Sequence, residues 1–148
     1  MELINLLEEE KKCLKDMLDI LNEEKAAVIS DDMQRLQGAA KKKEELKLKI
    51  DDLEITRIQK CGDKTLSEII SLHEGSEKAE LETLAADFKD IVKNIQKIND
   101  MNRRLINQSL NFVKAAISTA APSGTSVYGQ NGSINKKSTS SAMLDRNI

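Results

Sequence analysis

Residues 76–120 read SEKAELETLAADFKDIVKNIQKINDMNRRLINQSLNFVKAAISTA, and the apolar residues in this stretch follow a regular spacing. Two series recur every seven residues, one at Leu81, Phe88 and Ile95, the other at Leu84, Ile91, Ile98, Leu105 and Phe112. Steps of three and four residues place both series on one face of a helix. The first half of the stretch is acidic and the second half is basic, which complements the helix dipole. The stretch therefore predicts one uninterrupted helix from about Ser76 to Ala120, which Pro122 ends.

Two further long helices are expected before this stretch. The first runs from about Glu2 to Ile29, with apolar residues seven apart at Leu7, Leu14, Leu21 and Val28. The second runs from about Asp32 to Cys61, with an apolar stripe made of Met33, Leu36, Ala40, Leu46, Ile50, Leu53 and Ile58. Between them, Ser30-Asp31-Asp32 offers short polar side chains that can cap a new helix, so we expect a tight turn there.

A short helix is expected between the second and third long helices. Gly62 suits the left-handed conformation in which many helices end. The sequence Thr65-Leu66-Ser67-Glu68 has the spacing of a capping box, which opens a helix. Gly75 then closes this short helix.

The composition favours an all-α fold. Aromatic residues make up 2% of the chain, with 6 Gly and 1 Pro, which is too little aromatic filling and turn punctuation for a β-sandwich or barrel. We therefore expect an elongated antiparallel helical bundle, coiled-coil-like, with three long helices and one short helix. Residues 122–148 are rich in Ser, Thr, Gly and Asn and cannot bury enough apolar surface to order themselves. The predicted organisation is a bundle domain over residues 1–121 and a flexible tail over residues 122–148.

Several functional classes are not expected from this sequence. A net charge of −2 gives no electrostatic footprint for nucleic acid, and no apolar run approaches the roughly 18 residues of a membrane span. The N-terminus lacks the basic leader of a signal peptide, so we expect a cytoplasmic protein. His73 is the single histidine and no glycine-rich phosphate loop is present, so we expect no enzyme, catalytic residue or cofactor. In the hairpin, Cys13 and Cys61 should lie roughly 18 Å apart, too far for a disulfide or a shared metal.

Helix lengths predict where a partner could bind. The first two helices should each be roughly 40–45 Å long and the third roughly 65 Å, so its last four or so turns should project beyond the first hairpin. This projection carries a set of apolar residues, namely Leu105, Ile106, Leu110, Phe112, Val113 and Ile117. A large exposed apolar patch usually marks a partner site. Such a patch is compatible with binding of another protein and with self-association, so a homodimer is one of the two alternatives.

Two asparagines interrupt the apolar seam just before this projection. Asn99 and Asn102 stand where the Ile95–Ile98 part of the seam passes into Leu105 and Ile106. One interpretation is a buried polar layer that fixes the register between helices, as single Asn residues do in coiled coils. The other is a boundary between the part of the helix that serves the bundle and the part that serves a partner. The sequence favours neither.

Together these residues resemble the FlgN-type flagellar export chaperones. The resemblance covers nearly the whole chain and lies in five segments, in this order: Leu3-Ile4…Leu7…Glu10, Glu23-Glu24…Ala27, Leu53-Glu54…Arg57, Asn99-x-x-Asn102-x-x-Leu105, and a tail with Val127-Tyr128…Gly132 and Ala142…Asp145-Arg146. In the tail, Gly129 and Gln130 depart from the more acidic or proline-containing sequence expected there.

The resemblance implies a cytoplasmic chaperone for the hook-associated proteins that join the flagellar hook to the filament. Such chaperones bind the terminal helical segments of unassembled subunits and bring them to the flagellar type III export gate. Tyr128 matches the residue that the family is expected to use for docking at the export gate. The alternative from the residues alone is a homo-oligomeric coiled-coil scaffold or assembly regulator, and the stoichiometry of the complex would distinguish the two.

Overall fold

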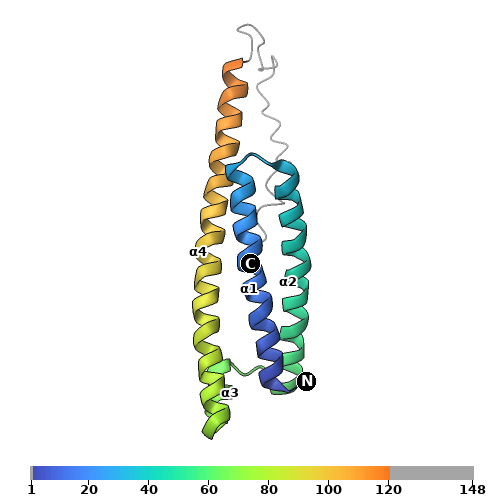
Figure 1. The fold of residues 1–148 in the computed structure, drawn as a ribbon, viewed down its shortest axis with the longest axis vertical. Helices are drawn as coiled ribbons and strands as arrows, with labels where there is room; N and C mark the ends of the chain where they lie inside the picture. Colours follow the sequence, from blue (N-terminus) through green and yellow to red (C-terminus); the bar gives the residue numbers. More distant parts are fainter. Residues whose placement is uncertain (1, 121–148) are drawn as a thin grey trace, which may run out of the picture. The chain divides into compact units, whose positions relative to one another are not determined.

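The computed structural model describes residues 2–120, and these residues form four helices. They are α1 (Leu3–Ile29), α2 (Met33–Cys61), α3 (Leu66–Ser71) and α4 (Gly75–Ala120) (Figure 1). The predicted all-α class, with three long helices and one short one, is confirmed. The chain divides into two units, Met1–Val113 and Lys114–Ile148, and the packing described below is that of the first. The predicted domain boundary after residue 121 lies at the edge of the described residues and stays a prediction.

The turn between α1 and α2 is tight, as the polar triplet predicts. The Ser30 hydroxyl donates to the Ala26 carbonyl at 2.8 Å, which closes the end of α1. Asp31 has a φ of 52°, a left-handed conformation that Asp tolerates better than most residues. Asp32 accepts a hydrogen bond from the Arg35 backbone N–H at 2.9 Å and so caps the start of α2.

Local sequence also sets the connection from α2 to α4. Gly62 ends α2 with a φ of 70°. The predicted capping box is present, because the Thr65 side chain accepts from the Glu68 N–H and the Glu68 carboxylate accepts from the Thr65 N–H. The Thr65 backbone N–H and the Thr65 hydroxyl both donate to the Glu68 carboxylate, and these hydrogen bonds lower the pKa of the Glu68 carboxyl below its usual value. The short helix α3 therefore begins where its sequence directs.

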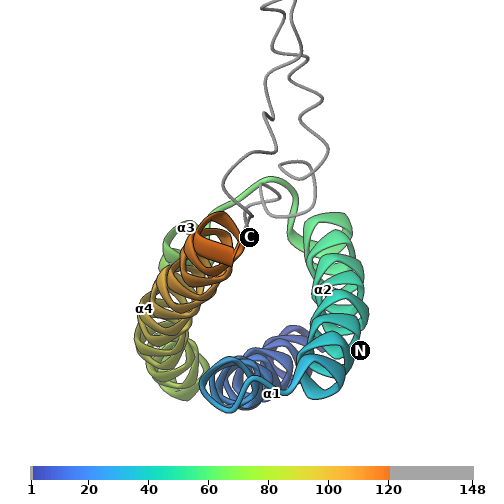
Figure 2. The ribbon, with the colours of Figure 1, turned by 90° about the horizontal axis from the view of Figure 1, so that it is seen from above.

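Within the first unit, α1 lies between α2 and α4 (Figure 2). The chain runs up α1, down α2 and up α4, so α2 is antiparallel to both of its long companions (Figure 1). The central helix therefore buries two stripes, one against each neighbour. The buried residues of α1 show this, because they lie on more than a single heptad line: Leu6, Leu7, Cys13, Met17, Leu21, Glu24 and Ala27.

The core consists of aliphatic side chains in three clusters. One joins Leu7 of α1 to Leu81 and Leu84 of α4, and a second joins Leu6, Cys13 and Leu53. The third joins Met17 and Leu21 to Ile91 and Ile95, with Leu14, Leu18, Leu46, Ile50 and Ile98 packed around them. The expected packing of Ile91, Ile95 and Ile98 against the first two helices is confirmed. On α2 the expected stripe is only partly buried: Ala39 is buried in place of Ala40, and Met33 and Ile58 are 65% and 37% exposed.

Replacement of Leu21 by alanine tests this core. Leu21 is 0% exposed and packs against α4, so Leu21→Ala should lower the free energy of unfolding by about 2–5 kcal/mol. Urea denaturation followed by circular dichroism measures this change. Leu48→Ala is the matched control, because Leu48 is 65% exposed and its loss should change stability by about 0.5 kcal/mol or less. Equal losses in the two variants would contradict the core assignment.

Candidate functional site

A layer of polar side chains crosses all three long helices at one level. Asn102 of α4 is 0% exposed, and its Nδ2 donates to the Leu21 carbonyl of α1 at 2.8 Å. Lys43 of α2 donates from Nζ to Asn99 Oδ1 at 3.1 Å and forms an ion pair with Glu24 of α1 at 3.4 Å. We call Glu24, Lys43, Asn99 and Asn102 the polar layer. Asn102 is buried and Asn99 half-buried, as the interpretation of a polar layer expects, and the role of this layer in fixing the register stays a prediction.

The polar layer separates two parts of the first unit that are packed differently. The three aliphatic clusters lie on the side of the helix ends Leu3 and Cys61. On the other side, toward the α1–α2 turn, the buried apolar residues are the two small ones Ala27 and Ala39. Asn102 Oδ1 is buried and has no hydrogen-bond partner among the described residues. The layer therefore marks the end of the well-packed core.

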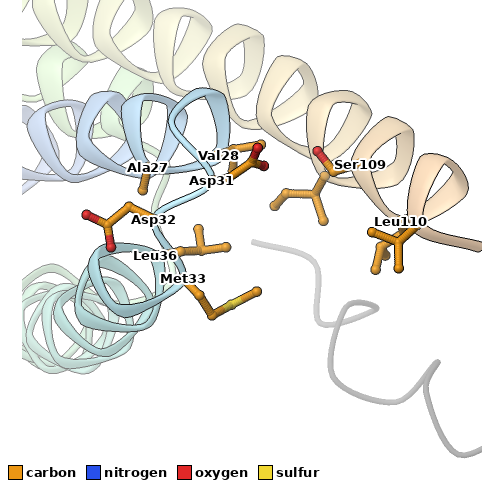
Figure 3. A pocket seen from close by; sticks show the side chains of 10 residues that line it. Ala27, Val28, Asp31, Asp32, Met33, Leu36, Ser109 and Leu110 are labelled. Atoms are coloured by element: carbon orange, nitrogen blue, oxygen red, sulfur yellow. The ribbon is translucent and has the colours of Figure 1, made fainter. Parts of the chain in front are cut away.

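Beyond the polar layer the three long helices surround a hollow of about 220 Å³ (Figure 3). Met33 and Leu36 extend from α2 toward α4, and Leu110 faces them from α4 (Figure 3). The hollow is lined by Ala27, Val28, Asp31, Asp32, Met33, Leu36, Ile106, Ser109, Leu110 and Val113. We call this feature the tip hollow. Its walls are mainly apolar, and its two charged residues are both carboxylates.

The structure corrects the expected position of the α4 residues. Ile106, Leu110 and Val113 lie beside the α1–α2 turn and line the tip hollow with it, so the prediction that they project beyond the hairpin is wrong. The reason is the register between α1 and α4. Leu7 packs against Leu81 and Leu84, so α4 begins more than a turn before it meets α1.

The other predicted partner-binding residues are placed as follows. Leu105 is half-buried, and Phe112 is 76% exposed outside the tip hollow. Ile117 belongs to the second unit and is 66% exposed. Tyr128 lies outside the described residues. Partner binding by these residues stays a prediction.

Sequence reasoning assigned Val28, Met33 and Leu36 to the core stripes and missed their place in the tip hollow. Met33 is 65% exposed, although it lies on the stripe of α2. One sequence feature could have indicated this place. The three residues lie within two helical turns of the α1–α2 turn, at the level of the part of α4 that follows Asn99 and Asn102. Periodicity alone could not use that signal, because it gives the face of a helix and not its offset against a neighbour.

A second polar cluster joins two segments of the FlgN resemblance, near the start of α1 and the end of α2. Arg57 donates from Nε and Nη2 to the two Glu54 carboxylate oxygens, both at 2.7 Å, and from Nη1 to the Lys64 carbonyl at 2.8 Å. Burial and the charge of Glu54 raise the pKa of the neighbouring Glu10, while Arg57 opposes this shift. The bidentate pair holds the Arg57 side chain within α2, and the hydrogen bond to the Lys64 carbonyl ties α2 to the loop that follows it, so this cluster has a structural role.

The remaining candidates show no organised chemistry. His73 lies at the end of α3, with Nδ1 2.8 Å from the Ile69 carbonyl oxygen. Cys13 is a buried free thiol that packs with Leu6 and Leu53, and burial raises its pKa. Within residues 2–120 no cluster of three or more His, Cys, Asp or Glu could hold a metal ion. In the same range no helix is long and apolar enough to span a membrane.

Comparison with known proteins gives one family and one relative. The model of the FlgN protein family matches residues 1–136 of the 148. The uncharacterized protein YvyG of Bacillus subtilis (strain 168) is 34% identical over 58 residues, which are 39% of this chain and 36% of the relative. The match thus spans little more than a third of that relative's length. No solved structure matches the chain.

The polar layer offers a test of buried against exposed ion pairs. Lys43→Met leaves the Glu24 carboxylate, on a residue that is 8% exposed, without its cation. We expect the free energy of unfolding to fall by about 1–3 kcal/mol. The matched control is Lys42→Met. Lys42 pairs with Glu23 at 3.2 Å, but the two side chains are 59% and 44% exposed, so the loss should be below about 0.5 kcal/mol.

Urea denaturation of both lysine variants measures the difference. If the two lost the same stability, the layer would contribute no more than a surface ion pair. A loss in Lys42→Met that exceeded the loss in Lys43→Met would also contradict the assignment.

Proposed function

Because the chain belongs to the FlgN family of flagellar export chaperones, we propose that it binds hook-associated proteins in the cytoplasm, keeps them unassembled and delivers them to the flagellar type III export gate. The family is non-enzymatic. The observation that carries the proposal is the apolar surface of α4 beyond the polar layer. That surface is exposed although it continues the seam of the core.

This surface has the form that an amphipathic helix needs. Ile106, Leu110 and Val113 are spaced by four and three residues, so they form a ridge on one face of α4. Leu110 and Val113 are 44% and 52% exposed, and Phe112 beside them is 76% exposed. A partner helix could lay its own apolar stripe along this ridge, as in other helix-in-groove complexes. Leu105 would extend the contact along α4, and Ile117 stays a predicted partner-binding residue of the second unit.

Such binding explains how subunits would be kept unassembled. The resemblance indicates that the terminal helical segments of hook-associated proteins are the bound segments. Apolar helices of that kind associate with one another unless their apolar faces are covered. A chaperone that covers one such face prevents premature assembly, and release at the export gate uncovers it again.

Delivery requires a second contact, and we assign it to the tail over residues 122–148. Tyr128 is the single tyrosine of the chain. An aromatic side chain can supply most of the energy of a weak docking contact. Placing docking on the tail and subunit binding on α4 separates the two tasks along the sequence.

A homo-oligomeric scaffold is the second candidate function, and the same exposed apolar ridge favours it. The two functions differ in stoichiometry. A chaperone forms a defined hetero-complex with a hook-associated protein, whereas a scaffold self-associates with increasing concentration. Co-purification from a flagellated host, followed by light scattering of the purified chain, distinguishes them.

The double change Leu110→Ser with Val113→Ser tests the binding ridge. A bound helix can still cover about half of each side chain, and fully covering one is worth about 1.5–3 kcal/mol. The double variant should therefore bind a hook-associated protein about tenfold to a hundredfold more weakly. Calorimetric titration measures the affinity, and circular dichroism should show an unchanged helical bundle.

Leu48→Ser with Ile55→Ser is the matched control for this titration. These residues lie seven apart on α2 and are 65% and 52% exposed, but they do not line the tip hollow. The affinity of this double variant for the hook-associated protein should equal that of the wild type. Equal affinities for all three proteins would remove the ridge from the mechanism, and unfolding of the first variant would assign its residues to the core.

Tyr128→Ala tests the docking role of the tail. The sequence predicts a flexible tail, and such a tail contributes little to stability, so the melting temperature and the affinity for hook-associated proteins should not change. Secretion of hook-associated proteins by a flagellated host that carries the variant should fall. Unchanged secretion, or a lowered melting temperature, would contradict the docking role.

A further inference from the structure

We propose that the α1–α2 turn forms the second wall of the subunit-binding site, and that its acidic rim selects a partner helix with a basic residue beside its apolar stripe. This inference rests on the proposed function and deepens it. It assigns a role to Met33, Asp31 and the residues around them, which the family resemblance leaves without one. The bound segment would thus enter the tip hollow, between two walls, and would not merely lie along α4.

The first argument is the convergence of apolar side chains from three helices. Val28 of α1, Met33 of α2 and Leu110 of α4 line the same hollow (Figure 3). Met33 extends into it and is nevertheless 65% exposed. No large apolar side chain of residues 2–120 fills this space, because the fully buried residues on this side of the polar layer are alanines. Apolar side chains therefore line the tip hollow, but no large apolar side chain of the described residues occupies it.

The size of the hollow indicates what could fill it. An apolar cavity on the order of 150 Å³ accommodates a benzene molecule, and the tip hollow measures about 220 Å³. It therefore has room for one or two large apolar side chains but not for a whole helix. The ridge on α4 would contact the length of a partner helix, while the hollow takes the side chains at one of its turns.

The second argument is charge. Asp31 and Asp32 are the two charged residues that line the hollow. One oxygen of Asp32 is engaged as the cap of α2, and neither carboxylate forms an ion pair with a Lys or Arg of the described range. An uncompensated acidic rim beside an apolar hollow is complementary to Lys or Arg. Their aliphatic stems pack on apolar surface while the charge stays at the edge.

The same rim argues against a second copy of this chain as the occupant. A two-fold contact would place the same surface patch of both copies together. Two tip hollows joined in this way would bring two pairs of aspartates face to face, and such like-charge pairs are unfavourable. A partner helix of opposite charge has no such conflict.

A comparison of two exposed residues on α2 tests the second wall. The probe is the hook-associated protein that forms a defined complex with the wild-type chain, titrated as the purified full-length subunit. Met33→Ser should weaken binding about tenfold, because a bound side chain would cover a methionine that is still largely exposed. Leu48→Ser is matched to it in helix and in exposure, at 65% for both residues, and should bind as the wild type does.

Asp31→Asn tests the acidic rim. Asparagine has nearly the same shape as aspartate and also tolerates the left-handed conformation of this position. We expect slower association, about threefold weaker binding at low ionic strength and a flatter dependence of affinity on salt. Asp52→Asn removes the same charge from an exposed position of α2 outside the hollow. It should leave affinity and salt dependence unchanged.

Each result decides one part of the inference. If Met33→Ser binds normally while Leu110→Ser with Val113→Ser binds weakly, the second wall is overturned and the proposed function stands. If Asp31→Asn keeps the affinity and salt dependence of the wild type, the choice of a basic partner is overturned. Light scattering that shows a wild-type dimer and a monomeric Met33→Ser variant would make a second copy the occupant. No binding of any hook-associated protein by the wild type would overturn the proposed function, and this inference with it.

Discussion

The hydrogen bond from the Asn102 amide to the Leu21 carbonyl fixes the position of α4 along α1. Aliphatic side chains alone permit two helices to slide by a heptad, since each leucine or isoleucine meets an equivalent apolar residue seven positions further along. A buried amide disfavours this slide, because a shift of one heptad toward the core would place it among the aliphatic side chains around Leu14. With Asn102 beside Leu21, the seam from Leu81 to Ile98 faces the apolar residues of α1. The same register brings Ile106 to Val113 level with the α1–α2 turn.

Lys43 extends this constraint to the third helix. Because α1 lies between α2 and α4 (Figure 2), these two outer helices need a long side chain to meet. Lys43 provides it, since its ammonium reaches Glu24 on α1 and Asn99 on α4. The aliphatic stem of the lysine can cover apolar surface at the same time. All three helices thus change from apolar to polar packing at one level, and the core ends there.

The helix ends could be predicted from the sequence, because the residues that set them act through local contacts. Asp32, Gly62 and the Thr65–Glu68 box each fix a helix end through contacts within four residues. The buried faces of the helices could be predicted for the same reason, apart from the exchange of Ala40 for Ala39 and the exposure of Met33 and Ile58 on α2. The register between helices could not be predicted in this way. It depends on Asn102 meeting Leu21, which lies 81 positions away in the chain, and no periodicity specifies that pair.

Only the α4 residues of the candidate site could be predicted from the sequence. The residues that α1 and α2 contribute depend on the register between the helices. Ile106, Leu110 and Val113 stood out because they continue a seam past two asparagines. Met33 and Val28 look like ordinary core residues until the offset of α4 is known. The sequence alone also could not decide whether the two asparagines form a buried polar layer or a boundary between two parts of the helix. The structure shows the polar layer. Packing differs on its two sides, so the same layer can also separate the part of α4 that packs in the bundle from the part proposed to bind a partner.

The division at the polar layer places stability and exposed apolar surface in different parts of the same bundle. The clusters of Leu7, Leu21 and Ile95 contain the large side chains whose burial stabilises the fold. Around the tip hollow, burial is limited to alanines, so this end has few contacts that resist local opening. A partner helix there would add burial where the free chain has least of it. Binding would then stabilise the weakest part of the bundle by mass action, and release would return it to the structure of the free chain without disturbing the core below Asn102.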